Sequence, residues 1–246
     1  MSSLAELLGG IPANVRAAEG AGTTTLTRDD NKHQVFNLSA SRNVQLPTTG
    51  IKAGDKFLIE NRAFFDLIIN ASGGSSLIVA NSCNFEGVIQ NGYCLLEALQ
   101  DAPTTPAHWR IIHVTESTVS SPSTFTGNGS GSGTTPSIGI KICRFNNVVQ
   151  IKINVVDGLQ VTSGTSMDRI SSNTAIPTRF RTTGAIGWHI HTREGSTRNI
   201  HGLITLKTDG KFEVFRDGVA NFAGSTANCG VEVASFDRYM LQYSID

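Results

Sequence analysis

Charged residues are scarce in this sequence. Asp, Glu, Lys and Arg make up 16% of the 246 residues, whereas a typical soluble domain has about a quarter. The 20 basic and 20 acidic residues cancel, and like charges form no long block. A protein that binds nucleic acid or an anionic lipid surface through charge carries a basic patch or stripe. The composition therefore predicts no nucleic-acid partner and no membrane-surface partner.

Paired cysteines and long apolar runs are also missing. The four cysteines, Cys83, Cys94, Cys143 and Cys229, stand far apart and form no Cys-x-x-Cys pair. This spacing favours buried thiols kept in a reducing compartment over a zinc site or a disulfide framework. No apolar run is long enough to cross a bilayer, and the first residues lack the basic patch and apolar core of a secretion signal. We therefore expect a soluble protein without membrane insertion or a signal peptide.

Glycine and small polar residues are abundant, and apolar residues come in short runs. This pattern predicts an all-β protein, because short apolar runs form strands, and glycine and small polar residues form the turns between them. No helical pattern separates the runs, so their spacing of about ten residues predicts an antiparallel β domain. The runs of the first block lie at residues 34–38, 43–46, 56–60, 66–70, 77–79, 93–96 and 109–114.

The composition also divides the chain. Residues 116–136 are rich in Gly, Ser and Thr and predict a flexible linker or long surface loop. We expect a docking segment over residues 1–31, of which 20–30 is a polar tether. A β spacer over 32–115 follows, and a β head over 137–246 comes after the linker.

The first residues carry the signals of a short helix. Ser3 and Glu6 form a capping box, and Gly9 is a natural stop. Leu4, Leu7 and Leu8 would lie on one face of this helix. So short a helix is unstable alone, so we expect either an anchor helix that docks on a partner or a frayed terminus without a role.

The second block has the clearest strand patterns. Val149, Ile151, Ile153 and Val155 alternate with polar residues, which is typical of a half-buried strand. Residues 185–193 and 200–207 predict a hairpin, and residues 208–211 predict a tight turn. The alternation of residues 236–245 predicts a last strand that is paired inside a sheet.

Several of these segments resemble parts of known virion proteins. The stretches 25–30, 44–47 (Val-Gln-Leu-Pro) and 54–61 (Gly-Asp-Lys-Phe-Leu-Ile-Glu-Asn) resemble a module of phage tail fibres, and Trp109 with its β-branched strand resembles that module's end. Residues 145–149, 176–181, 208–212 and 243–245 are similar to the jelly-roll heads of trimeric phage fibres. The resemblance implies a trimer with an N-terminal virion anchor and a C-terminal jelly-roll-like β-sandwich.

The strongest candidate for a metal-binding site is the stretch of residues 188–191 (Trp-His-Ile-His). His189 and His191 project from the same face of a strand. The motif resembles the His-x-His metal sites of some phage fibres, which implies a possible transition metal held at a trimer axis by three such pairs. The alternative is two ordinary polar residues on a sheet face. His201 would join the pair only if the hairpin register placed it opposite His191.

No catalytic motif stands out. Residues 164–168 come nearest to a serine motif but lack its second glycine, and Glu194 with Asp209 could serve a glycosidase only if the fold brought them together. We therefore expect no enzyme.

The sequence favours a structural virion protein made in the host cytoplasm. It would be a homotrimeric fibre or spike subunit that contacts other virion proteins through Leu4, Leu7 and Leu8. Its head would bind a host-surface receptor, with glycan as one candidate, through loops near residues 160–169 and 218–228. The alternatives are a capsid decoration protein and, less favoured, a glycan-degrading tailspike.

Overall fold

The computed structural model describes residues 13–71, 78, 85–123, 125–128, 138–154, 159–161, 169–194, 197–216, 229–231 and 241–245. Over these residues the protein is all-β, as predicted: strands β1 to β19 are joined by loops and two short 3-10 turns, η1 (Pro106–His108) and η2 (Thr178–Phe180). The predicted anchor helix, with Leu4, Leu7 and Leu8, lies outside the described residues. None of the described helical turns is long and apolar enough to cross a membrane.

The chain forms two compact units. Unit 1 comprises residues 1–118 and 143–147, and unit 2 comprises residues 119–142 and 148–246. The chain passes between them within β9 (Trp109–Ser123), within β11 (Ile138–Phe145) and between residues 147 and 148. The prediction of a flexible linker is wrong for residues 116–123, which belong to β9, and for β10 (Phe125–Asn128). Hydroxyl and β-branched residues such as Thr118 and Val119 suit a strand as well as a linker.

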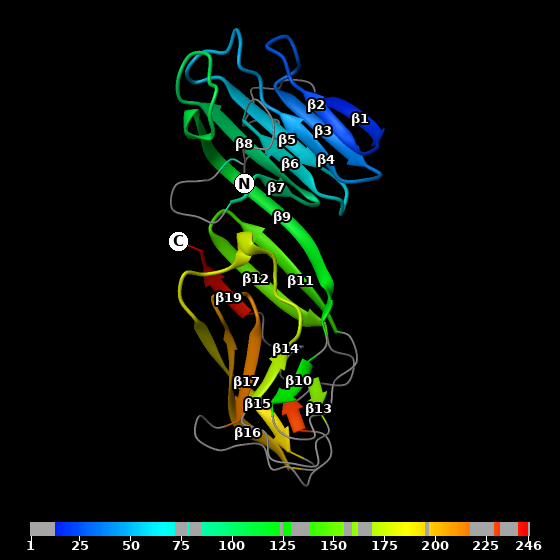
Figure 1. Cartoon of the computed structure of the whole chain (residues 1–246), viewed down its shortest axis with the longest axis vertical. Coiled ribbons are helices and arrows are strands. Elements are labelled where there is room, and N and C mark those ends of the chain that lie inside the picture. Colours follow the sequence, from blue (N-terminus) through cyan, green and yellow to red (C-terminus); the bar gives the residue numbers. More distant parts are fainter. Residues whose placement is uncertain are drawn as a thin grey trace. The chain divides into compact units, whose positions relative to one another are not determined.

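Unit 1 begins with two parallel ladders (Figure 1, blue to cyan). One pairs β1 (Asn14–Glu19), β3 (His33–Leu38) and β5 (Lys56–Asn61), and the other pairs β2 (Gly22–Thr25), β4 (Arg42–Gln45) and β6 (Leu67–Asn70). The chain alternates between the ladders and so makes three successive coils, each with a six-residue strand followed by a four-residue strand.

The registers of the two ladders agree. In the first ladder Asn14 faces Gln34 and His33 faces Leu58. In the second, Gly22 faces Arg42 and Arg42 faces Leu67. Equivalent residues are thus 20 positions apart between the first and second coils and 25 apart between the second and third. This arrangement is a short β-solenoid, in which each coil stacks on the one before it.

The predicted antiparallel β domain is therefore wrong for β1 to β6. Runs that follow each other in sequence enter different ladders, so sequence neighbours are not pairing partners. A parallel connection needs a crossover, and here the strand in the other ladder supplies it in place of a helix. Antiparallel pairing begins where β7 (Val88–Ile89) meets β6, and continues where β8 (Gly92–Ala98) joins β5 to β9. The predicted tether over residues 20–30 is also wrong, because it contains β2.

One apolar core lies between the ladders of unit 1. Inward side chains of both ladders, of β8 and of β9 line it, and Phe57 meets Trp109 edge to face with ring centroids 5.9 Å apart. Burial of this surface is the main driving force for stacking the coils. Its larger members include Leu26, Phe36, Val44, Leu46, Phe57, Ile59, Leu67, Ile69, Phe85, Leu96 and Trp109.

In unit 2 the strands that the structure describes pair antiparallel and share one hydrophobic core. Its larger sheet has the order β10-β14-β17-β16-β15-β18-β13, and β12 (Val148–Asn154) pairs with β19 (Leu241–Ser244). The remaining bounds are β13 (Leu159–Val161), β14 (Arg169–Ser172), β15 (Ile186–Glu194), β16 (Thr197–Leu206), β17 (Phe212–Arg216) and β18 (Cys229–Val231). Strands of two sheets contribute to the core. β11 with Ile140 and β19 with Leu241 belong to one sheet, and β14 with Ile170 belongs to the other.

Three local predictions for unit 2 are confirmed. Val149 and Ile151 are buried while Lys152 is exposed; the side chains of Ile153 and Val155 lie outside the described residues. The hairpin forms from β15 and β16, and the turn before β17 is closed by a hydrogen bond from the Gly210 amide to the Lys207 carbonyl of 2.9 Å. The last strand pairs with β12, as expected.

Candidate functional site

The hairpin register brings together two of the candidate histidines. His191 of β15 lies directly opposite His201 of β16, which is the condition under which His201 was expected to join the site. Their ring centroids are 6.0 Å apart and the ring planes meet at 62°. His189 lies two residues before His191 and faces Leu203 instead. His189 and His201 are exposed and His191 is half-buried, so the three define an accessible histidine face.

Buried residues on the opposite face of the hairpin hold this register. Ile190 faces Gly202, and both are buried. A Cβ atom at position 202 would lie 2.3 Å from Cγ2 of Thr192 and 2.8 Å from the carbonyl oxygen of Phe215. Only glycine fits there without a shift of these neighbours. The Gly202 backbone is thereby packed against Thr192, and His201 is directed outward beside His191.

The histidine face holds two close ligands, not three. Among the side chains that the structure describes, no group of three or more His, Cys, Asp or Glu residues is placed to hold a metal ion. A site that uses His189 and His191 of several copies remains a prediction. Neither of the cysteines whose side chains the structure describes, Cys94 and Cys143, forms a disulfide; Cys94 is buried, and Sγ of Cys143 donates to Oγ of Ser117 at 3.7 Å.

The two acids considered for glycoside hydrolysis are far apart. Glu194 ends β15 beside the hairpin turn, whereas Asp209 lies in the turn that follows β16. The ten residues of β16 separate them, which is about 30 Å of strand. The two carboxyl groups of a glycosidase stand about 5 to 9.5 Å apart, so this pair cannot serve. The serine-like residues 164–168 lie outside the described residues, as do most of the two predicted receptor loops.

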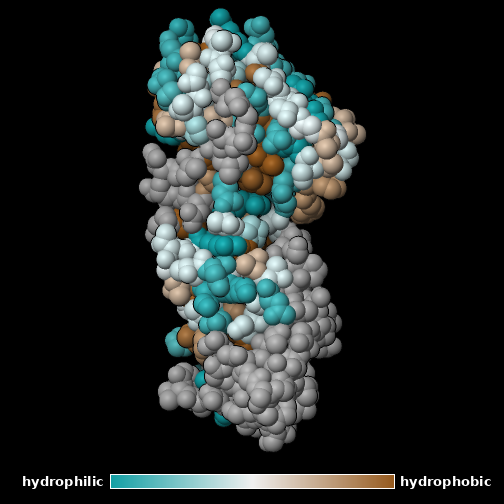
Figure 2. Space-filling model, in the orientation of Figure 1, coloured by the Kyte–Doolittle hydropathy of each residue, from teal (hydrophilic) through white to brown (hydrophobic). Residues whose placement is uncertain are grey.

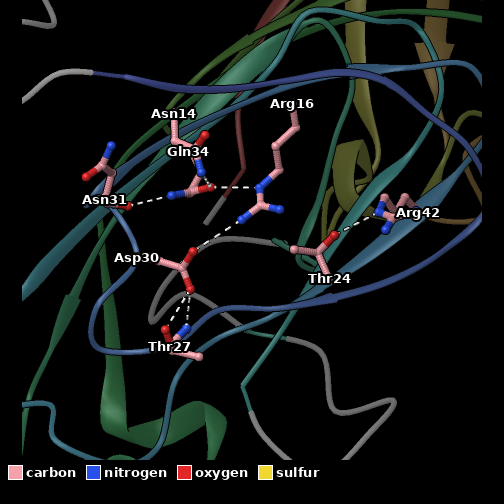
Figure 3. Close-up of polar contacts among 8 residues, drawn as sticks. All are labelled: Asn14, Arg16, Thr24, Thr27, Asp30, Asn31, Gln34 and Arg42. Carbon is pink, nitrogen blue, oxygen red and sulfur yellow. Dashed lines mark hydrogen bonds and ion pairs between the residues drawn. The ribbon is translucent and has the colours of Figure 1, made fainter.

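A partly buried polar network that sequence reasoning missed joins β1, β3 and the loop between β2 and β3 (Figure 3). Nε of Arg16 donates to Oε1 of Gln34 at 2.9 Å, and its guanidinium pairs with Asp30 at 3.3 Å. The Asp30 carboxylate also accepts the backbone N–H and the hydroxyl of Thr27, at 2.7 and 2.8 Å. Nε2 of Gln34, which is fully buried, donates to the carbonyl of Asn31 at 2.6 Å.

A second arginine, Arg42 of β4, bonds to three residues of the first coil. Nε of Arg42 donates to the hydroxyl of Thr24 at 2.8 Å, and its guanidinium reaches the carbonyl of Gly20 at 2.8 Å and the carboxylate of Glu19 at 3.1 Å (Figure 3 for the Thr24 contact). The two arginines are balanced by Glu19 and Asp30, so the network is neutral. Half-buried ions are tolerated when they are paired and hydrogen-bonded.

Two inward columns change from polar to apolar along the stack. One inward column runs Asn14, Gln34, Ile59, and another runs Thr24, Val44, Ile69. Repeat proteins need a terminal unit that presents polar groups, because its outer side has no neighbour to cover apolar ones. Together, Asn14, Arg16, Thr24, Asp30, Gln34 and Arg42 form what we call the polar cap of unit 1.

An aromatic strip lies on the other face of β8 and β9. Tyr93 stacks on His113 at 5.4 Å, and His113 meets Phe145 edge to face at 4.7 Å. Leu95, which faces His113 across the strands, is buried with Leu58 beneath Tyr93. Burial lowers the pKa of His113 and raises the pKa of Tyr93, because an apolar setting disfavours the charged form of each. The Phe145 ring is 57% exposed.

Exposed large apolar side chains gather in unit 1. Figure 2 shows a largely hydrophilic face interrupted by a compact hydrophobic cluster in the upper part of the view. Of the side chains the structure describes, the large apolar ones that are exposed all belong to unit 1: Val15, Phe64, Phe65, Leu99, Ile112 and Phe145. Exposed apolar side chains of this size offer unit 1 surface that could be buried by association.

No protein-family model matches the chain, and no curated protein matches it in sequence. The histidine face, the polar cap and the aromatic strip therefore have to be interpreted from their own chemistry.

Proposed function

We propose that this protein is a structural subunit of a virion fibre or spike. In this proposal three copies associate through unit 1, and unit 2 forms a jelly-roll-like head that binds a host-surface receptor. Residues 1–12, with Leu4, Leu7 and Leu8, attach the trimer to other virion proteins. A surface glycan is the candidate receptor class to test first.

The observation that carries the proposal is the capped stack of coils in unit 1. Parallel coils satisfy each other's backbone groups along the ladder, so they make a rigid spacer. The polar cap, with Arg16 and Arg42, places paired charges in the first described coil, where they disfavour stacking of another apolar coil. A spacer of defined length followed by a sandwich suits a protein that presents a head at a distance from a particle.

Association through unit 1 is supported by its exposed apolar side chains. Phe64 and Phe65 are adjacent and 57% and 46% exposed, and Phe145 extends the aromatic strip to the surface. Burial of such side chains contributes about 25 cal/mol per Å² of apolar area. Closed three-fold association would cover all copies of these side chains equally.

Sedimentation of the full chain tests the architecture. At micromolar concentration we expect a single species of about three times the 26.2 kDa of one chain, whereas a stable monomer would contradict the proposal. Phe145→Asp should shift the population toward monomer, because it would place a charge in the interface. Lys211→Asp, an exposed position in unit 2, is the matched control and should leave the trimer intact.

Copy number separates a fibre from a capsid decoration protein. Gel densitometry of purified particles should give a few dozen copies or fewer, whereas hundreds of copies would indicate decoration. Deletion of residues 1–12, which leaves β1 complete, should give a folded trimer that no longer incorporates into particles. Normal incorporation would remove the docking role of Leu4, Leu7 and Leu8. Release of reducing ends from host polysaccharide would instead identify a glycan-degrading enzyme.

A further inference from the structure

We propose that His191 and His201 form a two-histidine binding site for a divalent transition-metal ion, held within one copy of the chain across the β15–β16 hairpin. The proposal goes beyond the fibre function and does not depend on it, because both ligands belong to the same chain. It also differs from a site built by His189 and His191 at a trimer axis, in which each copy supplies neighbours along one strand.

The ring spacing is close to that of a shared metal ion. With metal–nitrogen distances of about 2.0–2.1 Å, an ion lies roughly 3.2 Å from each ring centre, and a tetrahedral angle sets the two centres about 5.2 Å apart. The observed separation is 6.0 Å. A small rotation of either side chain within its rotamer well removes the difference of less than about 1 Å. The backbone need not move, because His191 and His201 are already direct cross-strand partners.

The hairpin pre-organises the pair. β15 and β16 pair over most of their length, from Ile186 with Leu206 to Thr192 with Ile200. The tight packing of Gly202 against Thr192 resists a slip of the register, and a slip of one residue would turn His201 to the opposite face. A chelate therefore loses little conformational freedom when it binds the ion.

The ligand set indicates which ions to expect. Neutral imidazole suits Cu²⁺, Ni²⁺ and Zn²⁺, and affinity for a given nitrogen site rises to a maximum at Cu²⁺. The exposure of His201 leaves the remaining coordination positions open to water. With two protein ligands the site should bind more weakly than a three- or four-ligand structural zinc site. The open positions also allow a ligand with its own nitrogen or oxygen donors to complete the sphere.

Isothermal titration of CuCl₂, NiCl₂ and ZnCl₂ into tag-free full-length protein tests the site. We expect one ion per chain, with Cu²⁺ binding tightest. His201→Ala and His191→Ala should each weaken Ni²⁺ binding by about tenfold or more, because only one imidazole of the cross-strand pair remains. His189→Ala is the matched control: it lies on the same strand and face but opposite Leu203, and should change affinity by less than about threefold. The far-UV circular dichroism of each variant shows whether the hairpin unit is intact.

Stoichiometry and the pattern of the variants distinguish this site from its rivals. One ion per three chains, or an equal loss from His189→Ala and His201→Ala, would overturn the proposal in favour of a shared or His-x-His site. No heat of binding at millimolar Ni²⁺ would also overturn it. If a variant unfolds, the double replacement by glutamine, His191→Gln with His201→Gln, keeps polar side chains on this face and should still abolish binding.

Discussion

Replacing Gly92 with alanine should strongly destabilise unit 1. Gly92 begins β8, and a Cβ atom there would lie 2.0 Å from the carbonyl oxygen of Thr115 and 2.6 Å from Cα of Glu116. Both atoms belong to the backbone of β9, so the two strands would have to separate by about 1 Å. Such a shift would stretch the bond from the Ser117 amide to the Gln90 carbonyl, now 3.0 Å. Overpacking that forces backbone shifts costs about 1–3 kcal/mol or more, and we expect about 3 kcal/mol.

The two tryptophans allow this loss to be measured in unit 1 alone. Trp109 is 4% exposed in the core of unit 1, and Trp188 belongs to unit 2. In a Trp188→Phe background the remaining fluorescence reports unit 1 during urea unfolding. With a slope of about 2 kcal/mol per molar urea, the midpoint should fall by about 1.5 M.

Gly20→Ala is the matched control, since the nearest atom to its added Cβ would be Oγ of Ser39 at 4.0 Å. Equal urea midpoints for the Gly92 and Gly20 variants would refute the packing argument.

Three further outcomes follow from the described contacts. Arg16→Met should lower the unfolding free energy of unit 1 by about 1–3 kcal/mol, because the hydrogen bonds of the polar cap are lost. Arg62→Met removes an exposed ion pair and should lower it by less than about 1 kcal/mol. Equal losses would argue against a stabilising role of the polar cap. Because burial lowers the pKa of His113, the unfolded chain takes up the proton first. Stability should therefore fall as pH drops below about 6.5, and His113→Phe should reduce this dependence in urea titrations at several pH values. An unchanged pH profile would contradict that reasoning. Gly210→Ala, at φ +83°, should lower the thermal stability of unit 2 by about 1–2 kcal/mol, followed through Trp188.

Strands and turns with local signals were predictable from sequence. The alternation at Val149 and Ile151 fixes which face is buried, because the side-chain period of a strand is two. The Asp209–Gly210 turn carries its own signal, since glycine adopts the positive φ angle that the turn requires. In both cases the information lies within a few neighbouring residues.

The pairing partners of the first six strands were not predictable in the same way. A run such as residues 34–38 has the same pattern in a parallel and in an antiparallel ladder. The distinguishing feature is the match of Gly22, Arg42 and Leu67 at intervals of 20 and 25 residues. Unequal intervals and differing residue types hide this repeat from a search for self-similarity. The order of strands in space therefore required the structure.

The functional residues also divide into those with a local sequence signal and those brought together only by the fold. The His191–His201 pair was predictable only as a condition on the hairpin register, and Gly202 was the available signal for that register. The polar cap had no signal, because Arg16 contacts Gln34 and Asp30 only after the first coil has folded over the second. The aromatic strip likewise joins Tyr93, His113 and Phe145 from three separate strands.

The unequal coils of unit 1 show where this architecture accepts new sequence. The strands keep lengths of six and four residues, while the corner after the first-ladder strand grows from residues 39–41 to 62–66 and the return corner grows from 26–32 to 46–55. Lengthening a loop costs little, about 0.6 kcal/mol per doubling. An epitope or a foreign binding peptide grafted in the return corner at the exposed residues Thr49–Gly50 should thus be displayed on the surface while the ladders keep their registers.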